Sequence, residues 1–137
     1  MTQANKELLL KDLCSRLSYG VKIQVNDRVE ILEGIGILDN VAEYGSFLSC
    51  DIEEVKPYLF PLSSMTVEQR CKAQNLLPNK CEISFINSKI TFYGEDCCGI
   101  KLEQFDKLFK FFDSQHVDYR GLIPMGLAID ATGKNIY

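Results

Sequence analysis

Three residues near the C-terminus, His116, Asp118 and Arg120, alternate along the sequence and combine the side-chain types of an acid–base site. A histidine can act as a general base near neutral pH, a carboxylate can orient it, and a guanidinium can hold an anion. Residues two apart share one face of an extended segment, so a strand here would bring the three together. Because His116 also follows a predicted helix, where a cation is favoured, a capping or surface role is the competing interpretation.

These residues open segment 116–130, around which the rest of the chain is organised. The segment holds the only histidine together with Gly121, Pro124 and Gly126 in a dense apolar context. These glycines and this proline predict a short helix or 3₁₀ turn before Pro124, and then a final strand near residues 127–129.

The six cysteines offer a second possible chemistry. A nucleophilic cysteine needs a neighbouring base, and the chain has one histidine for six thiols, so a cysteine nucleophile is disfavoured. The ligand types for zinc are present, but CxxC and HxxxH spacings are missing, so we expect no metal. The predicted helices and strands place Cys14, Cys71 and Cys81 on apolar faces, which predicts buried, reduced thiols. The ligand types that such a zinc site would draw on are Cys71, Cys81, Cys97 or Cys98, and His116.

Charge and glycine spacing argue against nucleic-acid and nucleotide ligands. The net charge is −4, the isoelectric point is about 5.0, and Lys and Arg are scattered, which disfavours phosphate binding. Gly34 and Gly36 lack the third glycine of a dinucleotide loop, since Asp39 stands there, so a bulged hairpin is the better interpretation. We expect no cofactor. The mild acidity leaves an acidic, phage-type inhibitor that mimics nucleic acid as an alternative function.

Length and hydropathy predict one domain, residues 1–137, without a membrane segment. The longest apolar runs, such as 8–10 and 127–129, are only a few residues long. No signal peptide is visible at the N-terminus, so a cytoplasmic location is expected.

Periodicity predicts an α+β fold, with a small, mostly antiparallel sheet of four to six strands packed against two helices. The prolines of the 51–66 stretch predict an extended connection or edge strand. A capping box at Thr66 predicts a helix on which Val67, Cys71 and Leu76 face inward. The predicted elements are a helix over 4–18, a hairpin over 21–37, a strand within 41–50, a helix over 66–77, a hairpin over 81–92 with its turn at 87–88, and a helix over 101–114.

Several aromatic residues are candidates for an interface. Tyr58 and Phe60 stand beside Pro57 and Pro61, and Phe111 lies outside the apolar stripe of the 101–114 helix. Exposure of these rings would mark a surface that binds another protein or a second copy of the chain.

Three segments, residues 8–22, 56–65 and 118–130, resemble a family of short, uncharacterised proteins encoded in gut Bacteroides genomes and their phages or mobile elements. The matching residues are Leu8 to Lys22, Lys56 to Met65, Asp118 to Ile123 and Gly126 to Asp130, about a quarter to a third of the chain. The region 80–100 and the pair Pro124-Met125 depart from the family pattern. The resemblance implies an accessory role and no reaction.

The sequence thus predicts an accessory protein that is not an enzyme and that binds a protein partner or forms a homo-oligomer. The alternatives are a small hydrolase-like enzyme using His116, Asp118 and Arg120, and the acidic inhibitor.

Overall fold

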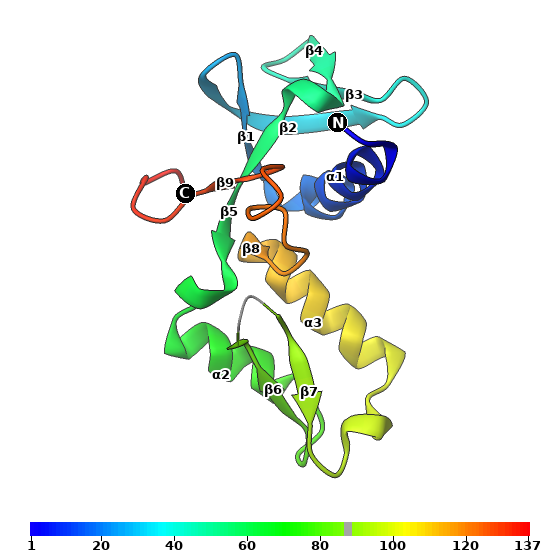
Figure 1. Cartoon of the computed structure of the whole chain (residues 1–137), viewed down its shortest axis with the longest axis vertical. Helices are drawn as coiled ribbons and strands as arrows, with labels where there is room; N and C mark the ends of the chain where they lie inside the picture. Colours follow the sequence, from blue (N-terminus) through cyan, green and yellow to red (C-terminus); the bar gives the residue numbers. More distant parts are fainter. Residues whose placement is uncertain (87–88) are drawn as a thin grey trace. The chain divides into compact units, whose positions relative to one another are not determined.

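The computed structural model describes residues 1–86 and 89–137 and has an α+β fold, as the sequence predicts (Figure 1). The chain divides into two compact units, each with its own apolar core. Unit 1 comprises residues 1–59 and 120–137, and unit 2 comprises residues 60–119. The interpretation of residues 1–137 as one domain stays a prediction.

Unit 1 begins with helix α1 (Gln3–Arg16), which confirms the predicted N-terminal helix. The Thr2 side chain caps it by accepting a hydrogen bond from the Asn5 amide at 3.2 Å. Leu9 and Leu13, one helical turn apart, are completely buried. Gly20 follows in the left-handed conformation, at φ 65°, which most other residues adopt only at a cost.

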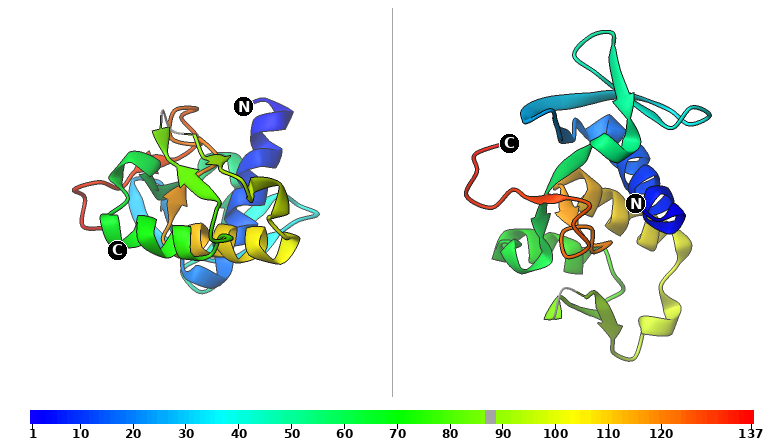
Figure 2. Two further views of the ribbon diagram at one scale, coloured as in Figure 1. Left: turned by 90° about the horizontal axis from the view of Figure 1, so that it is seen from below. Right: turned by 45° about the horizontal axis from the view of Figure 1, so that its top comes forward.

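Four neighbouring strands of the sheet are antiparallel to one another, and α1 packs against these strands (Figure 2). The first turn places Asn26 and Asp27 at φ 49° and 62°, the conformation of a tight type I′ hairpin. A register shift between Leu32 and Gly34 is the bulge that the glycines predict. The predicted single strand within 41–50 is in fact two strands. The strands are β1 (Lys22–Val25), β2 (Arg28–Gly36), β3 (Val41–Tyr44) and β4 (Leu48–Asp51).

Strand β5 (Lys56–Pro61) corrects the prediction of a connection or edge strand, because it is paired along its length. In unit 1 its first residues pair with β1 antiparallel, and Tyr58 pairs in parallel with β9 (Ile129–Asp130). In unit 2 Phe60 pairs in parallel with β8 (Val117–Asp118). Each neighbouring strand pairs with only two residues of β5, so Pro57 and Pro61 do not interrupt a long run of backbone hydrogen bonds. Among the described residues this sheet has seven strands, one more than the upper end of the predicted four to six.

Besides β8 and the end of β5, unit 2 contains two helices and a two-stranded hairpin, and both helices lie on one side of that hairpin (Figures 1 and 2). Thr66 and Gln69 form the predicted capping box of α2. Leu108 and Phe112 of α3 are completely buried. The predicted turn at residues 87–88 lies outside the described residues. The elements are α2 (Val67–Asn75), β6 (Glu82–Ser84), β7 (Thr91–Tyr93) and α3 (Leu102–Ser114).

The segment after β8 does not form the predicted short helix before Pro124. It forms turns, in which the Leu127 amide donates to the Leu122 carbonyl at 2.9 Å and the Gly126 amide to the Ile123 carbonyl at 3.0 Å. The final strand, β9, is where the sequence predicts it.

None of the helices in the described part of the chain has both the length and the apolar character needed to cross a bilayer; α1 has 14 residues.

Candidate functional site

The structure places His116 and Asp118 in unit 2 and Arg120 in unit 1. His116 follows α3 in the left-handed conformation, at φ 55°, and its amide donates to the Asp113 carbonyl at 3.1 Å. Its own carbonyl accepts from the Phe60 amide at 2.8 Å, so the His116 backbone joins the end of α3 to β5. Both His116 and Asp118 are buried. These are contacts of the His116 backbone, so the catalytic and the capping interpretations of its side chain both stay predictions.

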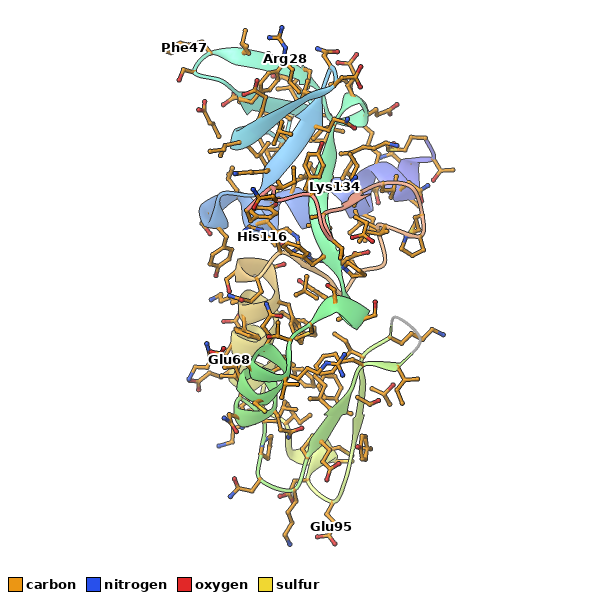
Figure 3. The ribbon with its side chains drawn as sticks, turned by 90° about the vertical axis from the view of Figure 1, so that its left-hand side faces the viewer. Arg28, Phe47, Glu68, Glu95, His116 and Lys134 are labelled. Atoms are coloured by element: carbon orange, nitrogen blue, oxygen red, sulfur yellow. The ribbon has the colours of Figure 1, made fainter. Side chains whose placement is uncertain are left out.

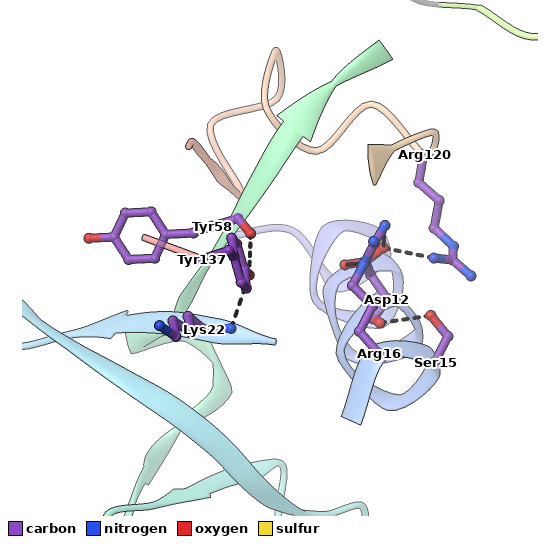
Figure 4. A network of polar contacts seen from close by, with 7 residues as sticks. All are labelled: Asp12, Ser15, Arg16, Lys22, Tyr58, Arg120 and Tyr137. Carbon is purple, nitrogen blue, oxygen red and sulfur yellow. Dashed lines mark hydrogen bonds and ion pairs between the residues drawn. The ribbon is translucent and has the colours of Figure 1, made fainter. Parts of the chain in front are cut away.

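Arg120 is bound to a carboxylate that the sequence analysis did not single out (Figure 4). Its Nη1 lies 2.7 Å from Asp12 Oδ1, and the Asp12 side chain has no exposed surface. The Arg16 side chain, also without exposed surface, donates from Nε to Asp12 Oδ2 at 2.9 Å and from Nη2 to Oδ1 at 3.0 Å. Asp12 therefore accepts charged hydrogen bonds from two guanidinium groups.

The i, i+4 spacing of Asp12 and Arg16 is the signal that could have identified this cluster, because such pairs meet on one helix face. Charged residues at this spacing are usually solvated, which is why the pair reads as part of the polar face of α1. The long-range partner, Arg120, has no local signal. With both α1 residues fully covered, the cluster holds unit 1 together and is closed to a substrate.

A second polar bridge joins Tyr137 to strands β1 and β5 (Figure 4). The Tyr137 hydroxyl accepts from the Lys22 amide at 3.0 Å and donates to the Tyr58 carbonyl at 2.8 Å. Ile23 pairs with Pro57 in the β1–β5 register, so Lys22 and Tyr58 are the next opposed residues. The hydroxyl thus replaces the direct bond between them.

Burial raises the pKa of Tyr137 to about 12, the hydrogen bond from the Lys22 amide and the charge of Arg16 oppose this, and the charge of Asp12 adds to it. The hydroxyl is therefore neutral near pH 7, as its donation to Tyr58 requires.

The cysteines lie differently from their predicted places. Cys81 is fully buried, as expected, but Cys14 and Cys71 are exposed, so that prediction is wrong for these two. Six thiols are free. In residues 1–86 and 89–137, no group of three or more His, Cys, Asp or Glu side chains is placed to hold a metal ion.

The three aromatic candidates for an interface are largely covered. Tyr58 is buried, Phe60 is half-buried, and half-buried Phe111 packs at a tilt against Phe112 with ring centres 6.0 Å apart. Their role as binding residues stays a prediction.

Unit 2 contains an open groove of about 460 Å³ between α2 and β6, within the usual size range of ligand sites. The prediction that Val67 and Cys71 face the core is wrong: Val67 is 78% exposed and Cys71 is exposed. Within α2 Ala73 is buried instead, and Leu77, just after the helix, is buried too. Leu76 packs against the core as predicted. Val67 and Cys71 are four residues apart, and so are Ala73 and Leu77, so the spacing alone does not predict which pair faces the core. The groove is lined by Val67, Arg70, Cys71, Gln74, Asn75, Ile83, Ser84, Phe85, Ile86 and Tyr93.

The Gln74 side chain binds the outer edge of β6 as a neighbouring strand would. Its Nε2 donates to the Cys81 carbonyl at 2.6 Å, and its Oε1 accepts from the Ile83 amide at 3.1 Å. This one side-chain amide occupies the length of one peptide along the edge, and the lining of the groove continues beyond it with Ser84, Phe85 and Ile86.

A cation faces this groove. The guanidinium of Arg70 lies over the Phe85 ring, 5.8 Å from its centre, in a cation–π contact. Lys89 lines an adjoining depression that shares Ser84, Ile86 and Tyr93 with the groove. Among the described residues, neither lining set contains Asp or Glu.

Unit 1 exposes apolar residues mainly at strand ends. Phe47, at φ 96° in the β3–β4 turn, is fully exposed and projects from the sheet (Figure 3). Val29 and Ile31 of β2 are about half-exposed, because their partners across the strand, Gln24 and Lys22, lie on the outer face.

Comparisons of the chain with models of protein families, with curated proteins and with solved structures find no match. The resemblance to the Bacteroides and phage family therefore stays a prediction.

Proposed function

We propose that the chain is a non-enzymatic accessory protein of the cytoplasm that binds another protein, and that the groove between α2 and β6 is its binding site. The observation that carries the proposal is the exposed stripe of Val67 and Cys71 along a groove of about 460 Å³. Covering a large apolar side chain is worth about 1.5–3 kcal/mol, so a partner that covers Val67 gains binding energy there.

The lining chemistry favours binding over catalysis. Among the described residues, the groove contains no His, Asp or Glu to transfer a proton at neutral pH. Arg120, the anion-holding member of the predicted catalytic set, donates to Asp12. Cys71 lines the groove, and the cytoplasm would keep its thiol reduced.

A protein partner suits the charge better than a nucleic acid does. The net charge of −4 opposes a polyanion as a whole, whereas one or two cations beside an apolar groove match a protein segment with a few acidic residues.

The test compares two substitutions at equivalent helix positions. Val67 is the first residue of α2 and Leu102 is the first residue of α3, where it is 86% exposed outside the groove. Aspartate is favoured at either position by the helix dipole, so Val67→Asp and Leu102→Asp both leave the fold intact. The wild type and both variants are immobilised, exposed to cytoplasmic extract of cells that express the protein, and read by quantitative mass spectrometry.

Proteins captured by the wild type and by Leu102→Asp but lost from Val67→Asp are the expected result. Equal capture by all three forms would contradict the groove as the binding site.

A further inference from the structure

The hairpin of unit 2 presents an incomplete sheet edge. Among the residues that the structure describes, β6 pairs with β7 alone, so no strand lies beside its other edge. The Ile83 amide points away from β7, because Gln74 binds it from the other side. The N–H and C=O of one antiparallel residue project from the same edge, so the Ile83 carbonyl also points toward the groove.

Gln74 shows which ligand this edge accepts. An amide donor and acceptor already lie against Cys81 and Ile83 in the manner of a peptide group. An extended segment laid along the groove would continue that pattern, with one of its N–H groups at the Ile83 carbonyl.

The side chains beside this edge of β6 favour a peptide ligand with a particular amino-acid pattern. Val67, Ile83 and Tyr93 provide apolar surface for alternate residues of an extended chain. Arg70 is the charged residue of the groove lining, and among the described residues no carboxylate binds it. Its neighbours on α2, Glu68 and Lys72, pair with each other at 2.9 Å and need no further partner.

We propose that the groove binds an extended peptide segment of a partner protein, added as a strand beside β6, with an Asp or Glu side chain bound by Arg70. The proposal rests on the groove being the binding site and names its occupant. A guanidinium stacked on an aromatic ring is held in place for bidentate binding of a carboxylate.

The first experiment selects a phage-displayed library of random linear peptides on the full chain, with binders to Val67→Asp removed. Peptides with an Asp or Glu flanked by apolar residues at alternate positions are the expected result. The most enriched peptide is then synthesised with a fluorophore, and its Kd is measured by anisotropy.

Two comparisons test the geometry. Arg70→Gln weakens the peptide by about tenfold, as expected for a charge-assisted hydrogen bond. Lys72→Gln on the same helix changes Kd by less than about twofold, since exposed pairs contribute little. N-methylation of alternate peptide amides abolishes binding for the set that faces β6 and is tolerated for the other set.

Other outcomes overturn the proposal in distinguishable ways. Peptides that need Val67 but carry no acid, ignore Arg70→Gln, or lose binding equally with both N-methylated sets leave the groove as a binding site with a different occupant, such as a helix. A wild-type dimer in sedimentation velocity that Val67→Asp dissociates makes a second copy the occupant. A library that yields no binder sensitive to Val67→Asp overturns the extended peptide alone if Val67→Asp still loses proteins that Leu102→Asp captures from extract, and it ends both proposals if all three forms capture the same proteins.

Discussion

Arg120 Nη1 lies 2.7 Å from Asp12 Oδ1, although 108 residues separate the two in the sequence. This contact ties the segment after β8 to the first helix, and Arg16 completes it from within α1. The segment around which the sequence is organised is thus anchored by a buried carboxylate. Loss of the Asp12 charge would leave the fully covered Arg16 without its bidentate partner.

Asp12→Asn is therefore expected to lower the free energy of unfolding by about 3–5 kcal/mol, the usual cost of breaking a buried charge pair. Urea denaturation followed by circular dichroism measures the change. The matched control is Asp106→Asn, which breaks another i, i+4 pair, with Lys110 at 2.8 Å, on the exposed surface of α3. The control should unfold almost like the wild type, and equal losses in both variants would refute the structural role of the Asp12 cluster.

Tyr137→Phe should lower stability by about 1–2 kcal/mol near pH 7, because the Lys22 amide and the Tyr58 carbonyl both lose their hydroxyl partner. The folded state raises the pKa of Tyr137 to about 12, above the value of about 10 in an unfolded chain. The contribution is therefore fully present below about pH 10 and is lost as the pH rises toward 12.

The measurement is the free energy of unfolding of the wild type and of Tyr137→Phe across this alkaline range. The difference between the two should shrink as the pH rises, since other alkaline groups affect both proteins alike. A difference that stays constant from about pH 9 to about pH 11, one unit above the pKa of an unfolded tyrosine, would show that folding does not shift the pKa of Tyr137.

Local signals predicted much of the fold. The caps at Gly20 and Thr66 define helix ends, and the Asn26-Asp27 turn fixes a hairpin, because each depends on neighbours in sequence. The parallel pairing of Tyr58 with Ile129 joins residues far apart in sequence, and it made β5 an inner strand despite its prolines. Such pairings depend on tertiary packing that short-range patterns do not encode.

The candidate sites were harder to predict for the same reason. The three predicted catalytic residues are close in sequence, yet His116 and Asp118 lie in unit 2 and Arg120 lies in unit 1. Arg120 forms an ion pair with Asp12 there. The groove depends on which of two equivalent stripes of α2 is buried, and Val67 carries the same periodicity signal as Ala73. Only the packing against α3 and β6 distinguishes them.

Thiol reactivity should follow the observed burial and not the sequence pattern. Cys71 and Cys98 are exposed and should react with N-ethylmaleimide soon after mixing. Cys14 is exposed as well, but partial desolvation raises the pKa of its thiol, which lowers the thiolate fraction and slows the reaction relative to Cys71 and Cys98. Burial also raises the pKa of the fully covered Cys81, which should react only after unfolding. Site-resolved mass spectrometry of timed samples measures the order, and rapid native labelling of Cys81 would contradict the structure of the second core.

Gln74 tests the β6 edge without any ligand. Gln74→Leu keeps a side chain of similar size but leaves the Cys81 carbonyl and the Ile83 amide without their partner, which should cost about 1–3 kcal/mol. Hydrogen exchange should show the Ile83 amide losing protection more than the amides of α3, because the edge opens before the core does. Asn75→Leu, at the exposed neighbouring position, is the matched control and should leave Ile83 protected. If Ile83 exchanges at the wild-type rate in Gln74→Leu, the side-chain amide does not hold this edge, and the model of an added strand loses its template.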